Sequence, residues 1–85
     1  MSSKAVQVQV FALLREENGN RPLEVELEFP LQASQLKAEL QRVYPDLAAL
    51  IGRSRLAVDL EFVQDDQVLT GEHRELALIP PVSGG

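Results

Sequence analysis

Leu23-Glu24-Val25-Glu26-Leu27-Glu28-Phe29 carries the clearest secondary-structure signal of the chain, because apolar and acidic residues alternate along its whole length. Successive side chains of a β-strand point to opposite faces of the sheet, so the alternation predicts a strand with an apolar face and a glutamate face. Carboxylates two residues apart on one face are usually the solvated side of a strand. A metal site or an acidic surface for a partner is the alternative. We predict a half-buried strand whose glutamates face water.

The residues before this stretch predict a second strand. Val6-Gln7-Val8-Gln9-Val10 alternates in the same way, and we extend this strand over residues 5–13. Between the two strands, Asn18-Gly19 favours a chain reversal because both residue types tolerate positive φ. The N-terminal part of the chain is therefore expected to be two strands joined by a reversal, with room for one helical turn.

Pro30 ends the glutamate-bearing strand, and a helical repeat follows it. The N-terminus of this helix looks poorly specified, since Gln32 stands where a Ser or Thr cap is common. Pro45 stops the repeat, and Asp46 is expected to cap a second short helix that ends at Gly52. The longer helix should cross the sheet with its apolar face inward. Its apolar positions recur at three- and four-residue steps: Ala33, Leu36, Leu40, Val43 and Tyr44.

The second half of the chain predicts shorter strands. Leu56-Ala57-Val58 is one, Phe62-Val63 is its return after a turn near residues 59–60, and residues 75–79 form the last. Asp65-Asp66 is expected in a solvated turn, and Leu69 is expected to fill the core. The first and last strands are apolar on nearly both faces, which favours adjacent central positions. The prediction is an α+β domain of the β-grasp type, with a mixed sheet, one main crossing helix and a second short helix.

Composition excludes several functions. The 85 residues carry a net charge of −5, which disfavours nucleic-acid binding and suits a basic protein partner. The chain has no cysteine, so a disulfide, a thiolate metal site and a cysteine nucleophile are excluded. No apolar run approaches a membrane span, and we expect a cytoplasmic protein with no metal and no bound cofactor. His73, the single histidine, is expected to be an exposed bystander.

The C-terminal stretch predicts a working tail. Residues 1–80 are assigned to the globular domain and residues 81–85 to an extended tail, because Pro80 and Pro81 end a strand and aim the chain outward. Gly84 and Gly85 lack a Cβ, so they fit a slot too narrow for other residues. An enzyme can then reach the terminal carboxylate and activate it as an acyl-adenylate, which makes the tail a substrate. The alternative is an ordinary frayed terminus.

The tail and several internal motifs resemble the MoaD-like sulfur carriers, the small subunits of molybdopterin synthase. The tail motif is Ala77-Leu78-Ile79-Pro80-Pro81-Val82-Ser83-Gly84-Gly85, and Val10-Phe11-Ala12 and Tyr44-Pro45 follow the family's order. The resemblance implies a ubiquitin-like fold. It also implies that a ubiquitin-activating-like adenylyltransferase consumes ATP to adenylate Gly85, which is then converted to a thiocarboxylate. Gly84 would be the spacer, and Pro80, Pro81, Val82 and Ser83 the tether.

The resemblance further implies a large synthase subunit as partner, in a heterotetramer of two small and two large subunits. The large subunit would supply the catalytic side chains, while this chain donates sulfur to a cyclic pyranopterin precursor without catalysing the transfer. Phe11 matches a family position in the apolar partner contact, and Ile79 lies beside the tail; ordinary core positions are the alternative for both. Asp59 departs from the family's common asparagine, and the turn at residues 71–75 is one residue longer.

Three other functions fit the same residues. A sulfur carrier of another pathway, such as thiamine synthesis, would share the Gly-Gly end. A ubiquitin-like protein modifier would be joined through Gly85 to lysines, and an inert β-grasp binding module would not use the tail at all.

Overall fold

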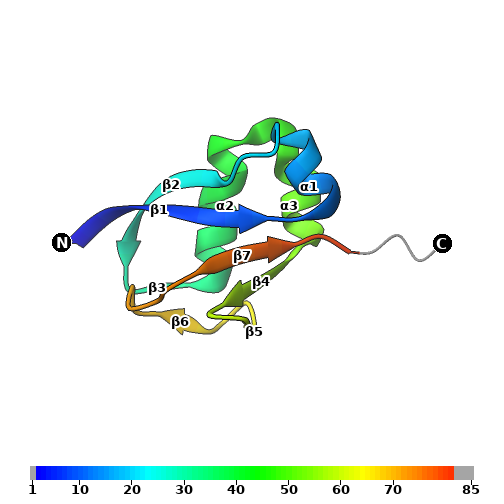
Figure 1. Ribbon diagram of the computed structural model, residues 1–85. Coiled ribbons are helices and arrows are strands. Elements are labelled where there is room, and N and C mark those ends of the chain that lie inside the picture. Colours follow the sequence, from blue (N-terminus) through cyan, green and yellow to red (C-terminus); the bar gives the residue numbers. More distant parts are fainter. Residues whose placement is uncertain (1, 82–85) are drawn as a thin grey trace.

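The first and last strands of the fold lie side by side in the middle of its main sheet (Figure 1). The computed structural model describes residues 2–81. The two central strands run parallel, and the other neighbouring pairs are antiparallel. The predicted mixed sheet and its central pair are therefore confirmed. The strand order is β2 (Leu23–Phe29), β1 (Ser2–Val10), β7 (Leu76–Ile79), β4 (Arg55–Val58) and β5 (Glu61–Phe62).

Helices cover one face of this sheet, which completes a ubiquitin-like β-grasp fold of the α+β class. Figure 1 shows α2 crossing behind the strands, with the short helices grouped at one end. A second, two-stranded sheet joins β3 (Leu31–Gln32) to β6 (Val68–Leu69). Within residues 2–81, no helix is long and apolar enough to cross a membrane. The helices are α1 (Ala12–Glu17), α2 (Ala33–Val43), the 3₁₀ helix η1 (Pro45–Leu47) and α3 (Ala48–Arg53).

The core lies between α2 and the inner face of the sheet. Leu36 and Leu40 of α2 are completely buried there, as are Val8 and Leu78 of the two central strands. The alternation predicted for residues 23–29 is confirmed, since its leucines and valine are buried and its glutamates are exposed. Leu69 is buried as predicted. Apolar burial between one helix and one sheet face is thus the main stabilising term of the fold.

The first strand is shorter than predicted. It ends at Val10 instead of continuing to residue 13, because Ala12 takes a positive φ of 52° and turns the chain into α1. In the helix, Leu14 is buried while Leu13 is 51% exposed. Residues 10–14 are all apolar, so the sequence does not show that the chain changes from strand to helix within them.

Four helix and turn details also differ from the prediction. Asp46 does not cap α3, since it lies inside η1, and Gly52 lies within α3, which continues to Arg53. The start of α2 is better capped than expected, because the Gln35 side-chain oxygen accepts the Gln32 N–H at 2.7 Å. The reversal before β2 uses positive φ at Gly19 and Asn20 instead of at residue 18.

Candidate functional site

The last strand carries the chain rigidly to the base of the tail. β7 is hydrogen-bonded on both sides, to β1 and to β4, and Leu76, Ala77 and Leu78 are buried. The strand ends at Ile79 where the two prolines begin, as predicted; Pro80 is buried and Pro81 is exposed. The expected roles of Val82, Ser83, Gly84 and Gly85 concern residues outside those that the structure describes.

The start of β7 is held by Asp59, which lies in the turn between β4 and β5. One oxygen of its carboxylate, Oδ1, accepts the backbone N–H of Arg74 at 2.7 Å and that of Glu75 at 2.8 Å. These hydrogen bonds favour the charged form, and they hold the pKa of the Asp59 carboxyl below its ordinary value. They also explain why β7 begins at Leu76 instead of Glu75. Asp59 thus fixes where the tail-bearing strand enters the sheet.

An apolar surface lies on the outer face of the sheet near the end of β7. The register places Arg55 opposite Ile79, and Ala57 lies between Ala77 and Phe62. Side chains directly opposite one another share a face. The Arg55 guanidinium lies 4.0 Å from the centroid of the Phe62 ring, a cation–π contact. We call this surface the tail-end face; its residues are Phe11, Arg55, Phe62 and Ile79. Ala57 and Ala77 lie on the same side of the sheet but are buried.

Phe11 lies at the margin of the tail-end face and is exposed. The preceding residue, Val10, is buried and pairs with Leu78, and Phe11 is itself extended, so its side chain points to the opposite, outer face. Its exposed fraction is 44%, and that of Phe62 is 50%. The alternative that Phe11 is a core residue is therefore wrong, whereas Ile79 is half-buried.

Sequence reasoning missed two members of the tail-end face. Sequence periodicity assigns Phe62 to a strand without a functional role, and it gives no role to Arg55. The signal in the sequence is the apolar pair Phe62-Val63 after the turn at residues 59–60. A short strand at the sheet edge has little core to fill, so a large apolar side chain there can lie on the surface. The placement of both residues depends on the register between β4 and its neighbours, which hydrophobic periodicity does not determine.

Among residues 2–81, no three or more histidine, aspartate or glutamate side chains gather closely enough to hold a metal ion. Glu24, Glu26 and Glu28 are exposed, as predicted. His73 is less exposed than predicted: its ring packs at a centroid distance of 5.7 Å from Phe29. Partial burial lowers the pKa of the His73 imidazole, and the nearby Lys4 lowers it further.

Comparison with known proteins identifies the family. The model of the ThiS family matches residues 8–85, from the first strand through the glycine pair. The chain belongs to the ThiS family. Two relatives are each named molybdopterin synthase sulfur carrier subunit. The one from Dictyostelium discoideum is 33% identical over 87 residues, covering 98% of this chain and 99% of the relative.

The second relative, from Synechococcus elongatus, is 34% identical over 70 residues, covering 76% of this chain and 78% of its own length. Among solved structures, SAMP1 from Haloferax volcanii superposes with a TM-score of 0.76 at 23% identity. That match covers 96% of this chain and all of the other, and it supports the fold alone. In this ThiS-family chain the match extends over both the tail-end face and the tail.

Proposed function

We propose that this ThiS-family protein is the sulfur carrier subunit of a molybdopterin synthase, with Gly85 as the residue that carries the sulfur. The names of two relatives, 33% and 34% identical, support the assignment. The observation that carries it is the placement of β7: a central, buried strand brings the chain to Pro80 beside an exposed apolar face. This arrangement suits a tail presented to one partner after another.

The proposed chemistry takes place on the terminal carboxylate. An oxygen of the Gly85 carboxylate attacks the α-phosphorus of ATP on a ubiquitin-activating-like adenylyltransferase, and pyrophosphate leaves. Hydrosulfide from the sulfur source then attacks the acyl carbon and displaces AMP, and loss of the remaining S–H proton leaves a thiocarboxylate. ATP is consumed by the activating enzyme, and this chain itself binds no cofactor. Sulfur is finally transferred to a cyclic pyranopterin precursor, and the carboxylate is regenerated by water.

The large synthase subunit is the proposed partner for transfer. The tail-end face docks on it, with Phe11, Phe62 and Ile79 as the apolar contacts, while Pro80, Pro81, Val82 and Ser83 tether Gly84 and Gly85 in the active-site slot. Apolar surface exposed beside a functional tail supports docking there. The complete assembly is a heterotetramer of two small and two large subunits in the cytoplasm. The large subunit supplies the catalytic side chains.

Intact mass spectrometry tests the carrier function. The chain is incubated with ATP, a sulfur source and the cognate activating enzyme, beside a variant that lacks Gly85. We expect one oxygen to be replaced by sulfur in the full-length chain alone. Conjugates of this chain with lysines of other proteins would instead support a protein modifier. An unchanged mass, under conditions that load a known carrier, would leave an inert binding module.

Transfer distinguishes the two carrier pathways. The loaded chain is mixed with the molybdopterin synthase large subunit and its pyranopterin precursor, and separately with the sulfur-accepting enzyme of thiamine synthesis. Loss of sulfur only in the first mixture supports the proposal. Loss only in the second would assign the chain to thiamine synthesis.

A further inference from the structure

The outer edge of β2 is a long strand edge without a neighbouring strand. β2 ends the main sheet on the side away from β5, and seven residues, Leu23–Phe29, form it. Tyr44 occupies one end of this edge: its hydroxyl accepts the Glu24 N–H at 2.9 Å and lies 3.3 Å from the Glu24 carbonyl oxygen. The backbone groups of Glu24 therefore point away from β1.

The same orientation applies to Glu26 and Glu28. In an antiparallel pair, alternate residues direct both backbone groups to the same side, so the N–H and C=O of these two glutamates also point away from β1. Within residues 2–81, these outward groups have no hydrogen-bond partner. The edge therefore offers one donor and one acceptor at each of the two residues.

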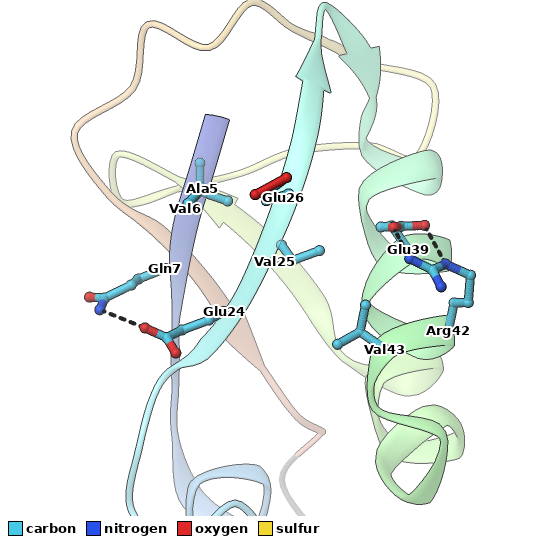
Figure 2. Close-up of a pocket in the computed structure, with 9 residues that line it drawn as sticks. All are labelled: Ala5, Val6, Gln7, Glu24, Val25, Glu26, Glu39, Arg42 and Val43. Carbon is cyan, nitrogen blue, oxygen red and sulfur yellow. Dashed lines mark hydrogen bonds and ion pairs between the residues drawn. The ribbon is translucent and has the colours of Figure 1, made fainter. Parts of the chain in front are cut away.

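A groove runs between this edge and α2. Figure 2 shows Val25 directed toward α2, which contributes Glu39, Arg42 and Val43 to the opposite wall. Val43 was expected in the core because it continues the apolar repeat of α2, but it is 41% exposed. An apolar side chain entering the groove would cover Val43 and the exposed rim of the strand.

The charge of the edge is strongly acidic. Among residues 2–81, Glu24, Glu26 and Glu28 have no cationic side chain within ion-pair distance. Arg42, on the opposite wall, is already paired with Glu39 at 2.6 Å. A row of carboxylates on one face of a strand is complementary to lysines or arginines at alternate positions of an added strand, since cross-strand neighbours share a face.

We propose that the edge of β2 is a docking site for an extended basic segment of a partner protein, which adds to the sheet as a further strand. Its backbone pairs with Glu26 and Glu28. Its basic side chains lie beside the glutamates, and its apolar side chains enter the groove against Val43. The site shares no residue with the tail-end face and extends the protein's interactions beyond the proposed sulfur transfer.

The same features disfavour a second copy of this chain as the occupant. Pairing β2 with another β2 would place glutamates beside glutamates, and like charges at neighbouring positions destabilise a strand pair. Charged residues also protect free edges from such self-association. If the glutamates only protect the edge from self-association, a basic strand should bind this edge no better than any other acidic site. A preference of the basic strand for this edge therefore distinguishes docking from protection.

The probe is an eight-residue peptide of alternating lysine and valine, acetylated and amidated, titrated into the full chain labelled with ¹⁵N. We expect the largest amide shifts at Glu26 and Glu28 with smaller ones at Val43. A glutamate–valine peptide should produce none of them. An N-methylated lysine–valine peptide, which keeps the side chains but lacks backbone donors, should lose the binding. Removal of Gly84 and Gly85 should leave binding of the lysine–valine peptide unchanged, so the result is independent of the tail's function.

The charge-reversal variant Glu26→Lys should weaken binding about fivefold, because an attraction is replaced by a repulsion. Glu61→Lys is the matched control: it makes the same change at an exposed strand residue on the opposite sheet edge and should have no effect. Glu28→Lys provides a second variant if the first does not fold. Equal weakening by Glu61→Lys would show non-specific charge attraction and overturn the proposal. Undiminished binding of the N-methylated peptide, or pairing of two copies through β2, would also overturn it.

Discussion

Asp59 and Glu75 hold each other through two hydrogen bonds. The Asp59 carboxylate accepts the Glu75 N–H at 2.8 Å, and the Glu75 carbonyl oxygen accepts the Asp59 N–H at 2.9 Å. The contact joins the turn between β4 and β5 to the residue just before β7. Asp59 is therefore a structural anchor for the turn at residues 71–75.

Asp59→Ala should lower the melting temperature by several degrees, because the backbone N–H groups of Arg74 and Glu75 lose their acceptor. Asp59→Asn is the matched variant, since its side-chain oxygen can accept the same bonds and asparagine tolerates the positive φ of 51° at this position. It should retain most of the stability. Thermal unfolding followed by circular dichroism measures both; equal losses in the two variants would contradict an acceptor role.

The contribution of the Asp59 charge to stability should decrease at acidic pH. Hydrogen bonds from Glu75 and Arg74 lower its pKa in the folded state, so its contribution is present above the unfolded pKa of about 3.9 and is lost as pH falls through the folded value. The difference in melting temperature between the wild type and Asp59→Asn should therefore shrink on acidification from about pH 5. A constant difference would show that the carboxylate charge contributes nothing.

His73 should add a second pH dependence at higher pH. Partial burial, followed by Lys4, lowers its folded pKa, so the unfolded chain takes up a proton first as pH falls below about 6.5. Stability should fall over that range in the wild type and be flatter in His73→Gln. Melting temperatures at intervals between about pH 7 and pH 5 test this. Parallel curves for the two proteins would rule out His73 as the titrating group.

Gly71 and Gly19 offer a comparison between crowded and open turns. Both have positive φ, 94° and 66°, but a Cβ at Gly71 would meet the Phe29 ring at 3.0 Å, while one at Gly19 would meet nothing within 4 Å. Gly71→Ala should cost roughly 2 to 4 kcal/mol through strain and overpacking, and Gly19→Ala about 1 kcal/mol through strain alone. Urea unfolding of the two variants measures the difference. Equal costs would mean that the Phe29 ring moves freely.

Phe11→Asp should weaken binding to the large synthase subunit and leave the fold intact, because Phe11 is exposed next to the end of β7. Surface substitutions usually change stability by less than about 0.5 kcal/mol. Leu78→Asp is the contrasting change, since Leu78 is completely buried and a charge there should prevent folding. Calorimetric titration with the large subunit, beside thermal unfolding, distinguishes the two effects. Full affinity of folded Phe11→Asp would remove the tail-end face from the docking surface.

The sequence predicted the fold well wherever one periodicity ran without interruption. Alternation at residues 6–10 and 23–29 correctly assigned the inward and outward side chains, and the helical repeat from residue 33 located α2. The end of β1 was missed because Phe11, Ala12 and Leu13 remain apolar while the backbone turns. The hydrophobicity of a residue does not show whether other side chains bury it in the folded chain.

The candidate site was harder to predict because it depends on contacts between distant segments. Phe62 joins the tail-end face only through the register of β4 with β5 and β7, and Asp59 becomes an anchor only when residues 74 and 75 fold beside it. Local patterns contain neither relationship. The end of β7 was predictable, because proline lacks the backbone N–H that a strand pair needs and therefore ends a strand without help from distant residues.

The central position of β7 also affects folding during synthesis. Val8 pairs with Leu76, yet the ribosome makes the first of these strands long before the second. Until β7 emerges, nothing in the main sheet connects β1 and β2 to β4 and β5. A chain interrupted before Leu76 would lack the middle of its sheet and remain open to proteolysis. The main sheet is therefore complete only after its last strand has been made.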